Sequence, residues 1–187
     1  MPSIKIFLDT EFTGLHRNTT LISLAMVAET GEEFYAEFTD YDKTQLTDWL
    51  NENVVKKLDG NLPDAANVNI KGKEIKVSGT RAEIASLLRP WFNRFGVVEI
   101  WADVLAYDWV LFCDLFGDAH GIPGNIFFAP FDLATLFRIR GMIEPGEENK
   151  KDLSRFEFVG ADKGKQHHAL EDARVEMKCF KKLMKNE

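Results

Sequence analysis

The chain has 187 residues, of which 45% are hydrophobic and 28% are charged, a composition typical of one globular domain over residues 1–187. Its formal net charge of −7 argues against a broad surface that coats nucleic acid, because such a surface would be basic; contact with a strand end alone is not excluded. The sequence has no metal-type cysteine spacing, no signal-peptide layout and no run of about 18 apolar residues. We therefore expect a cytoplasmic protein with no membrane association.

Three strands are predicted at the start of the chain. The apolar residues 4–8 predict a strand that leads into Asp9. Residues 20–28 and 33–38 predict two further strands, which form a hairpin across the turn at residues 29–32.

Helices are predicted next. Large apolar residues recur at helical spacing over 45–58 and predict a helix there: Leu46, Trp49, Leu50, Val54 and Leu58. Residues 60–79 are rich in glycine, asparagine, proline and lysine, which predicts a long loop or a weak hairpin. Thr80 is then expected to begin a helix that extends to about residue 95, with Glu83 three residues on completing a capping box.

The second half of the chain alternates short strands with helices. Residues 97–101 predict a buried strand, residues 107–116 a helix, and residues 125–128 a further short strand. Asp132 is expected to cap a helix over residues 133–139.

Residues 141–166 predict a polar loop, and the last helix is the clearest element of the sequence. Its apolar side chains are spaced by three and four, which predicts one buried stripe with the charged remainder in solvent. The stripe comprises Leu170, Ala173, Met177, Phe180 and Met184. Cys113 and Cys179 lie in predicted helices and are interpreted as buried, inert thiols. Strands first, then alternating helices and strands, predict an α/β fold with a mixed sheet covered by helices.

Two carboxylates lie at the end of the first predicted strand. Asp9 and Glu11 are two residues apart, so their side chains point to the same face of the strand. Like charges held side by side repel each other, and a divalent cation between them would remove that repulsion, since magnesium prefers carboxylate oxygen. The alternative is that Asp9 begins a turn and Glu11 is solvated.

Further candidate ligands lie later in the chain. Asp108 lies between aromatic residues where a strand passes into a helix, so it is either a helix cap or a ligand, and Asp103 competes for the same role. His167 and His168 precede Asp172 at the start of the last helix. His168 and Asp172 share a helix face, whereas His167 meets Asp172 only if it precedes the regular helix. Taken alone, the histidine pair could equally cap the helix or lie on the surface.

Together these residues resemble the three motifs of the DEDDh (DnaQ-like, ribonuclease T-like) 3′–5′ exonuclease superfamily. Residues 9–15, Asp-Thr-Glu-Phe-Thr-Gly-Leu, are similar to its first motif and residues 103–108 to its second. Residues 167–172 match its third motif, histidine-x-alanine-x-x-aspartate. The motifs occur in the right order across nearly the whole chain. The amino-acid sequences of residues 99–108 and 168–174 are most similar to those of a small 3′–5′ exoribonuclease subfamily with mycobacterial and phage-like members.

The resemblance implies a ribonuclease H-like fold, with a central mixed sheet flanked by helices. It implies two Mg²⁺ ions, replaceable by Mn²⁺, held by four carboxylates: Asp9, Glu11, Asp108 and Asp172. It also implies His167, rather than His168, as the general base. Asp103 is a departure, because many members carry asparagine there, and it could alter metal affinity or point away.

Four carboxylates balance the four positive charges of two magnesium ions, which suits hydrolysis of a phosphodiester to nucleoside 5′-monophosphates. Phe12 and Leu15 are predicted to stack on or wedge between terminal bases, with core packing as the alternative. Arg155, Lys163 and Lys165 are predicted to contact backbone phosphates, with a solvated loop as the alternative.

The expected partner is single-stranded or 3′-overhanging RNA or DNA. The resemblance favours RNA, and it makes a homodimer an expectation, because similar exonucleases commonly dimerise. The alternatives are a 3′–5′ DNA exonuclease of the same fold, an endonuclease, a non-catalytic nucleic-acid-binding module, and a phosphatase acting on small nucleotides. The complete carboxylate set argues against the binding module, and release of free phosphate would identify the phosphatase.

Overall fold

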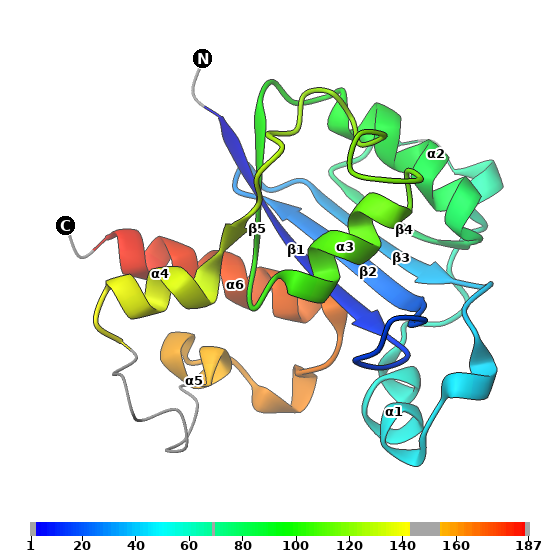
Figure 1. Cartoon of the computed structure of the whole chain (residues 1–187), viewed down its shortest axis with the longest axis horizontal. Helices are drawn as coiled ribbons and strands as arrows, with labels where there is room; N and C mark the ends of the chain where they lie inside the picture. The colour runs from blue at the N-terminus through cyan, green and yellow to red at the C-terminus, as the bar shows by residue number, and fades with distance from the viewer. Residues whose placement is uncertain (1–2, 69, 143–153, 186–187) are drawn as a thin grey trace.

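The computed structural model describes residues 3–68, 70–142 and 154–185, and a six-stranded mixed sheet lies at its centre (Figure 1). The strands have the order β4-β3-β2-β1-β5-β6. Their bounds are β1 Ile4–Phe12, β2 Leu21–Ala28, β3 Glu33–Phe38, β4 Glu74–Gly79, β5 Val98–Ala102 and β6 Phe131–Asp132. β2 is antiparallel to β1 and β3, whereas the β1–β5, β3–β4 and β5–β6 pairs are parallel. The predicted α/β class with a mixed sheet is confirmed.

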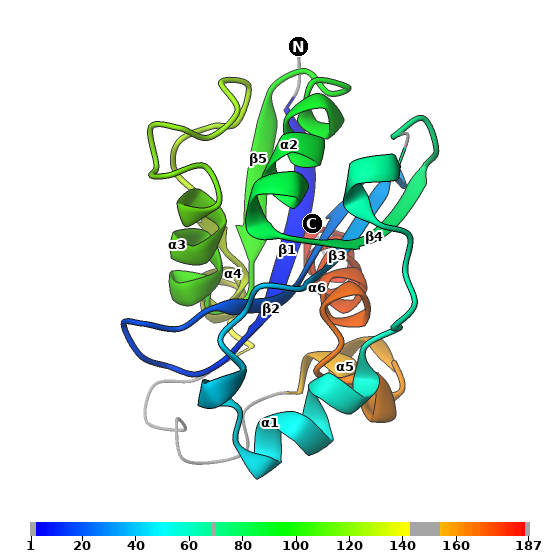
Figure 2. The same cartoon turned by 90° about the vertical axis from the view of Figure 1, so that its right-hand side faces the viewer.

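Helices cover both faces of the sheet (Figures 1 and 2). Their bounds are α1 Asp48–Asn53, α2 Arg81–Phe92, α3 Ala106–Asp114, α4 Leu133–Ile139, α5 Arg155–Val159 and α6 Ala169–Met184. Strand side chains alternate between faces, so Leu8 packs with α2 and α3, whereas Phe7 packs with α4 and α6. Asp9 and Glu11 continue the Phe7 alternation toward α6, and Thr10 continues the Leu8 alternation toward α3.

Side-chain caps fix several helix starts. Thr80 and Glu83 form the predicted capping box at α2, in which each side chain accepts the other residue's backbone N–H. Asp132 caps α4 as predicted, by accepting a hydrogen bond from Thr135 N at 2.9 Å. In the part of the chain that is described, no helix combines the length and the apolar character needed to cross a membrane.

The helix predicted over 45–58 is wrong in its extent. α1 covers only six residues, and a separate 3₁₀ helix, Val55–Lys57, follows it. The break leaves Trp49 54% exposed, whereas Leu50 and Val54, apolar residues of the same predicted helix, pack on Ile22 of β2. A short helix can turn only one narrow stripe to the sheet, so the outlying aromatic is left outside the core.

Two predictions about strands are wrong. The segment 60–79, predicted as a loop or weak hairpin, contains β4, which pairs in parallel with β3 along its whole length. The buried Ile75 and Val77 alternate with less buried residues there, a strand pattern that the neighbouring glycines and lysines obscured. The short strand predicted at 125–128 is reduced to a single bridge at Ile126, and β6 lies beside β5 instead.

The predicted polar loop 141–166 contains a helix. Ser154 caps α5 by accepting a hydrogen bond from Glu157 N, and α5 packs against α6. Residues 143–153 of the predicted loop lie outside the described residues.

α6 buries most of its predicted stripe but departs from it at two positions. Leu170, Ala173 and Phe180 are buried, whereas Met184, at the end of the helix, is 38% exposed. Glu176 was expected in solvent with the other charged residues, yet it is only 4% exposed. In this buried position Glu176 Oε1 accepts a hydrogen bond from Asp103 N, a distant residue in the sequence, at 3.0 Å. Both cysteines are buried, as predicted.

Candidate active site

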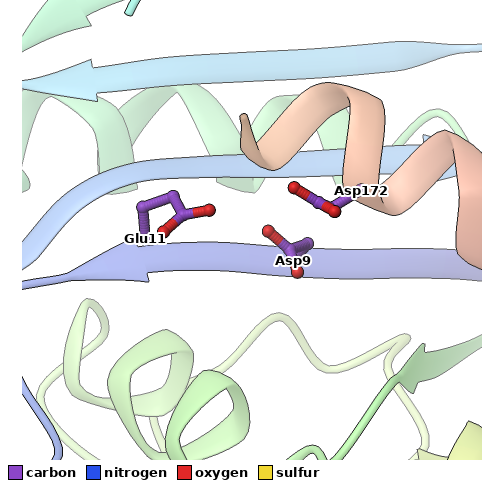
Figure 3. A group of neighbouring side chains, drawn as sticks. All are labelled: Asp9, Glu11 and Asp172. Atoms are coloured by element: carbon purple, nitrogen blue, oxygen red, sulfur yellow. The ribbon is translucent and has the colours of Figure 1, made fainter. Parts of the chain in front are cut away.

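Three carboxylates converge above β1 (Figure 3). Asp9 and Glu11 project from one side of β1, and Asp172 reaches them from the first turn of α6. One carboxylate oxygen from each residue lies within 4.8 Å of the other two. The alternation along β1 and the packing of α6 across β1 and β2 therefore bring together residues from opposite ends of the sequence.

Burial raises the pKa of every carboxyl group in this cluster. It is the largest cause of the raised pKa of Asp9, followed by the negative charges of Asp172 and Glu176. The pKa of Glu11 rises to about 8 and that of Asp172 to about 7, in both cases chiefly through burial. Asp9 Oδ2 is buried and has no hydrogen-bond partner among the described residues. This donor set, short of positive charge and rich in carboxylate oxygen, fits a hard divalent cation.

Asp108 approaches β1 from the side of α3. It lies in the first turn of α3, inside the helix, so it is not the N-cap. Its Oδ1 accepts hydrogen bonds from Thr10 N at 3.0 Å and Thr10 Oγ1 at 2.6 Å. Burial raises its pKa to about 6, and the two Thr10 bonds oppose that rise because they favour the carboxylate. Asp108 lies outside the group of three but lines the same cleft.

The two histidines before α6 have different surroundings. His167 has a φ of 65°, in the left-handed region that few residues other than glycine adopt. Its ring forms an edge-to-face pair with Trp49, with centroids 5.1 Å apart. His168 stacks on Tyr35 with centroids 4.9 Å apart, and its Nε2 is 3.3 Å from Asp59 Oδ1. The left-handed turn thus directs the two rings apart: His167 lines the cleft and His168 a second, smaller pocket.

The environment of His167 favours its neutral form. Burial lowers its pKa below the ordinary value, and the positive charge of Lys57 lowers it further. A neutral imidazole can accept a proton near neutral pH. On the other side of the loop, Asp172 accepts a hydrogen bond from His168 N at 3.0 Å, which ties the histidine loop to the carboxylate cluster.

The carboxylates and His167 line a cleft of 950 Å³ that also has apolar walls. Phe12 and Tyr107 stack there, with ring centroids 5.4 Å apart and an interplanar angle of 18°. Leu15 also lines the cleft and is 77% exposed. Flat apolar rings beside a charged cluster suit a ligand that has both bases and phosphates.

The three basic residues predicted to contact phosphates have acidic neighbours. Arg155 lines the cleft, and its Nε and Nη2 lie 2.8 and 3.0 Å from the Asp103 carboxylate. The Asp103 carboxylate, which also lines the cleft, is therefore directed to Arg155. Lys163 also lines the cleft, and it forms an ion pair with Glu157. Lys165 lies at the second pocket, 3.3 Å from a carboxylate oxygen of Glu171.

The sequence matches one protein family over almost its whole length. Residues 4–184 match the family described as the 3′–5′ exoribonuclease Rv2179c-like domain. The chain belongs to this family. Two relatives from strains of Mycobacterium tuberculosis, the 3′–5′ exoribonucleases Rv2179c and MT2234.1, are each 31% identical over 138 residues. The matched part covers 74% of this chain and 76% of each relative. The family resemblance drawn from the three motifs is confirmed.

The fold of this chain is also similar to that of solved exonuclease structures. The nuclease domain of 3′hExo, described as a DEDDh family member bound to rAMP, has a TM-score of 0.56 at 16% identity and matches 98% of this chain and 92% of its own. Escherichia coli exonuclease I in a complex with single-stranded DNA has a TM-score of 0.60 at 15% identity. This chain is fully covered there but spans only 40% of the exonuclease I chain.

These likenesses confirm the predicted ribonuclease H-like exonuclease fold. Family membership makes the chain a 3′–5′ exonuclease, a hydrolase of phosphodiester bonds. The acidic cluster and the exonuclease fold together indicate the use of a divalent metal.

Three residues that lie at or beside the cleft of this exonuclease were not predicted from the sequence. Trp49 was counted only among the apolar residues that predict a helix over 45–58. Lys57, in the 3₁₀ helix after α1, donates a hydrogen bond to Gln166 O. Glu176 lines the cleft one helical turn after Asp172. Only Glu176 carried a usable signal, because a residue four positions after Asp172 lies on the same helix face.

Proposed function

We propose that this exonuclease is a magnesium-dependent exoribonuclease that degrades single-stranded or 3′-overhanging RNA from its 3′ end to nucleoside 5′-monophosphates. The observation that carries the proposal is the convergence of Asp9, Glu11 and Asp172 in a cleft that also contains His167 and stacked aromatic rings. RNA is favoured because the related M. tuberculosis proteins are named exoribonucleases. The proposal treats residues 1–187 as one exonuclease domain.

Two Mg²⁺ ions, which Mn²⁺ can replace, are proposed to be held by four carboxylates: Asp9, Glu11, Asp108 and Asp172. Support comes from the raised pKa values of these groups and from the buried Asp9 Oδ2, which has no hydrogen-bond partner in the part of the chain that the structure describes. When bound, a pair of such ions stabilises the charge on the attacking and leaving oxygens of an in-line displacement.

His167 is the proposed general base, which accepts the proton of the attacking water at an imidazole nitrogen. Its lowered pKa leaves the ring neutral near neutral pH, as this role requires. His168 is poorly suited to the role, because Tyr35 and Asp59 engage its ring outside the cleft. A positioned general base typically contributes about 10²–10⁴-fold to a rate.

The apolar wall of the cleft is proposed to bind the bases at the 3′ end of the strand. Phe12, supported from behind by Tyr107, offers a ring for stacking, and Leu15 offers an exposed wedge beside it. Stacking of this kind is tolerant of sequence, as the degradation of RNA of mixed sequence requires. The proposed phosphate contacts are Arg155, Lys163 and Lys165.

A 3′–5′ DNA exonuclease is the second candidate. It is favoured by one observation, the likeness of the fold to E. coli exonuclease I, which was solved with single-stranded DNA and with a dT13 oligonucleotide. A homodimer also belongs to the proposal, and light scattering during size-exclusion chromatography tests it.

The test uses a 5′-labelled single-stranded RNA, the matching DNA, and a duplex with a 3′ overhang. Each is incubated with Mg²⁺, with Mn²⁺ and with a chelator. The expected result is a metal-dependent ladder that shortens from the 3′ end, fastest on RNA, with nucleoside 5′-monophosphates as the product. Faster shortening of DNA would favour the second candidate. Intact strands with folded, metal-supplied protein would refute both, and free phosphate would indicate a phosphatase.

A further inference from the structure

Trp49 lies in an unusual place for a large aromatic residue. It is 54% exposed, yet α1 around it is anchored, because Leu50 and Val54 pack on Ile22 of β2. Thr47 also fixes the start of α1 by accepting a hydrogen bond from Leu50 N at 3.2 Å. The indole is therefore presented to the cleft from a fixed element rather than from a loose loop.

The rings of Trp49 and His167 meet edge to face in the cleft. The two rings have centroids 5.1 Å apart and an interplanar angle of 75°, the edge-to-face arrangement that aromatic pairs favour. A second contact comes from the same stretch of chain, because Lys57 donates a hydrogen bond to Gln166 O, directly before His167. The loop is thus held from the α1 side by two contacts and from the α6 side by the bond between His168 N and Asp172.

The backbone at His167 needs such support. A left-handed φ of 65° at a residue with a side chain is a strained conformation that persists only when its surroundings hold it. The imidazole also has two rotatable side-chain bonds, and each alternative rotamer would carry its nitrogens to a different part of the cleft. A rigid indole beside the ring restricts this choice.

We propose that Trp49 is a positioning residue for His167, which holds the imidazole where it can accept the proton of the attacking water. This inference rests on the proposed role of His167 as the general base. Lys57 assists by fixing the backbone of the loop. Trp49 acts through His167, so its removal misplaces the base without weakening the binding of RNA. Misplacement of a catalytic group by about 1 Å can cost up to about 100-fold in rate.

The test is a double-mutant cycle on the full chain, with variants Trp49→Ala, Trp49→Phe, His167→Ala and Trp49→Ala/His167→Ala. Phe128→Ala is the matched control, because Phe128 is 78% exposed and outside the cleft lining. Single-turnover rates at saturating protein and equilibrium binding of 5′-labelled RNA are measured for each. We expect Trp49→Ala to lower the rate about 10- to 100-fold, with RNA affinity held within about twofold. Trp49→Phe should recover most of the rate, and the double variant should be no slower than His167→Ala.

A second readout does not depend on turnover. The ring current of Trp49 should shift the imidazole carbon-bound proton resonance of His167, and Trp49→Ala should abolish that shift. An unchanged resonance would overturn the proposal. The proposal would also be overturned if the double variant were slower than His167→Ala by the same factor by which Trp49→Ala alone slows the wild type. A third contrary result is a Trp49→Ala variant that loses RNA affinity but keeps the saturated rate, since Trp49 would then act on the substrate. Full activity of His167→Ala would instead refute the proposed general base itself.

Discussion

Substitution of Asp172 by asparagine is expected to abolish turnover and yet stabilise the metal-free protein at alkaline pH. Burial, more than any other cause, raises the pKa of Asp172 from an ordinary value of 3.8 to about 7. A raised pKa in the folded state means that the protonated form contributes stability, which is fully present below the unfolded value. That stability is lost as the pH rises through about 7. Asparagine has no proton to lose, so the variant escapes this loss.

The size of the effect follows from the pKa. One pKa unit corresponds to ~1.36 kcal/mol, so the difference between 3.8 and about 7 corresponds to at most about 4 kcal/mol. Asp9 and Glu11 share the repulsion and can keep a proton in place of Asp172, which reduces the gain. We therefore expect the free energy of unfolding of the variant to exceed that of the wild type by about 1–3 kcal/mol at about pH 8. In a protein of this size, ~1 kcal/mol raises Tm by roughly 2–4 °C.

The assay is thermal unfolding, followed by circular dichroism, of the wild type and Asp172→Asn in a chelating buffer. The difference in Tm between the variant and the wild type should grow between about pH 5 and pH 8, because the wild type loses stability over that interval. Mg²⁺ should then raise the Tm of the wild type and leave the variant nearly unchanged, since a ligand stabilises only the folded state that binds it. Asp48→Asn, at an exposed position of α1, is the control.

Two results would refute this reasoning. A metal-free variant that melts at or below the wild type at about pH 8 would show that ionisation of Asp172 does not destabilise the folded protein. A gap that stays constant with pH would show that the effect of the substitution has nothing to do with the proton on Asp172.

Three further predictions concern the rate of hydrolysis and its dependence on Mg²⁺ and pH. His167→Ala should lower the single-turnover rate about 10²–10⁴-fold, whereas His168→Ala should lower Tm but largely keep the rate, as rapid-quench and melting measurements would show. Thr10→Val removes the Oγ1 hydrogen bond to Asp108, so a metal titration should give a half-maximal Mg²⁺ concentration about tenfold higher; an unchanged value would mean that Asp108 needs no such support. Burial and Lys57 hold the pKa of His167 below 6.5, so the rate should fall only at more acidic pH, and an inflection above that value in the pH–rate profile would contradict the role of a neutral base.

The parts of the site that follow from one element could be predicted from the sequence. Asp9 and Glu11 share a face because alternation is a property of the strand itself, and no tertiary information is needed to see it. The capping box at Thr80 and the cap at Asp132 are local for the same reason. The meeting of Asp172 with Asp9 requires α6 to cross the sheet, and only the likeness of the motifs to a known family indicated it.

Elements that depend on distant partners were missed. β4 lies at the edge of the sheet, and its strand character comes from parallel pairing with β3 rather than from a strongly apolar sequence. α5 has only five residues and is held mainly by α6, so its own sequence does not predict a helix. The position of Trp49 depends on where α1 ends, and helix ends are the least predictable part of a helix.

Glu176 shows why charge alone is an unsafe guide to burial on α6. A helix that packs on a sheet usually turns its charged residues to solvent, so a charged residue inside the apolar stripe was read as an exposed one. On α6, however, the first turn of the packed face carries Asp172 into the cleft, and Glu176 follows one turn later on that same face. Its carboxylate finds Asp103 N as a donor only once α6 and the end of β5 have come together. The local pattern therefore fails where the fold builds its reactive cleft, because there a packed helix face serves chemistry as well as stability.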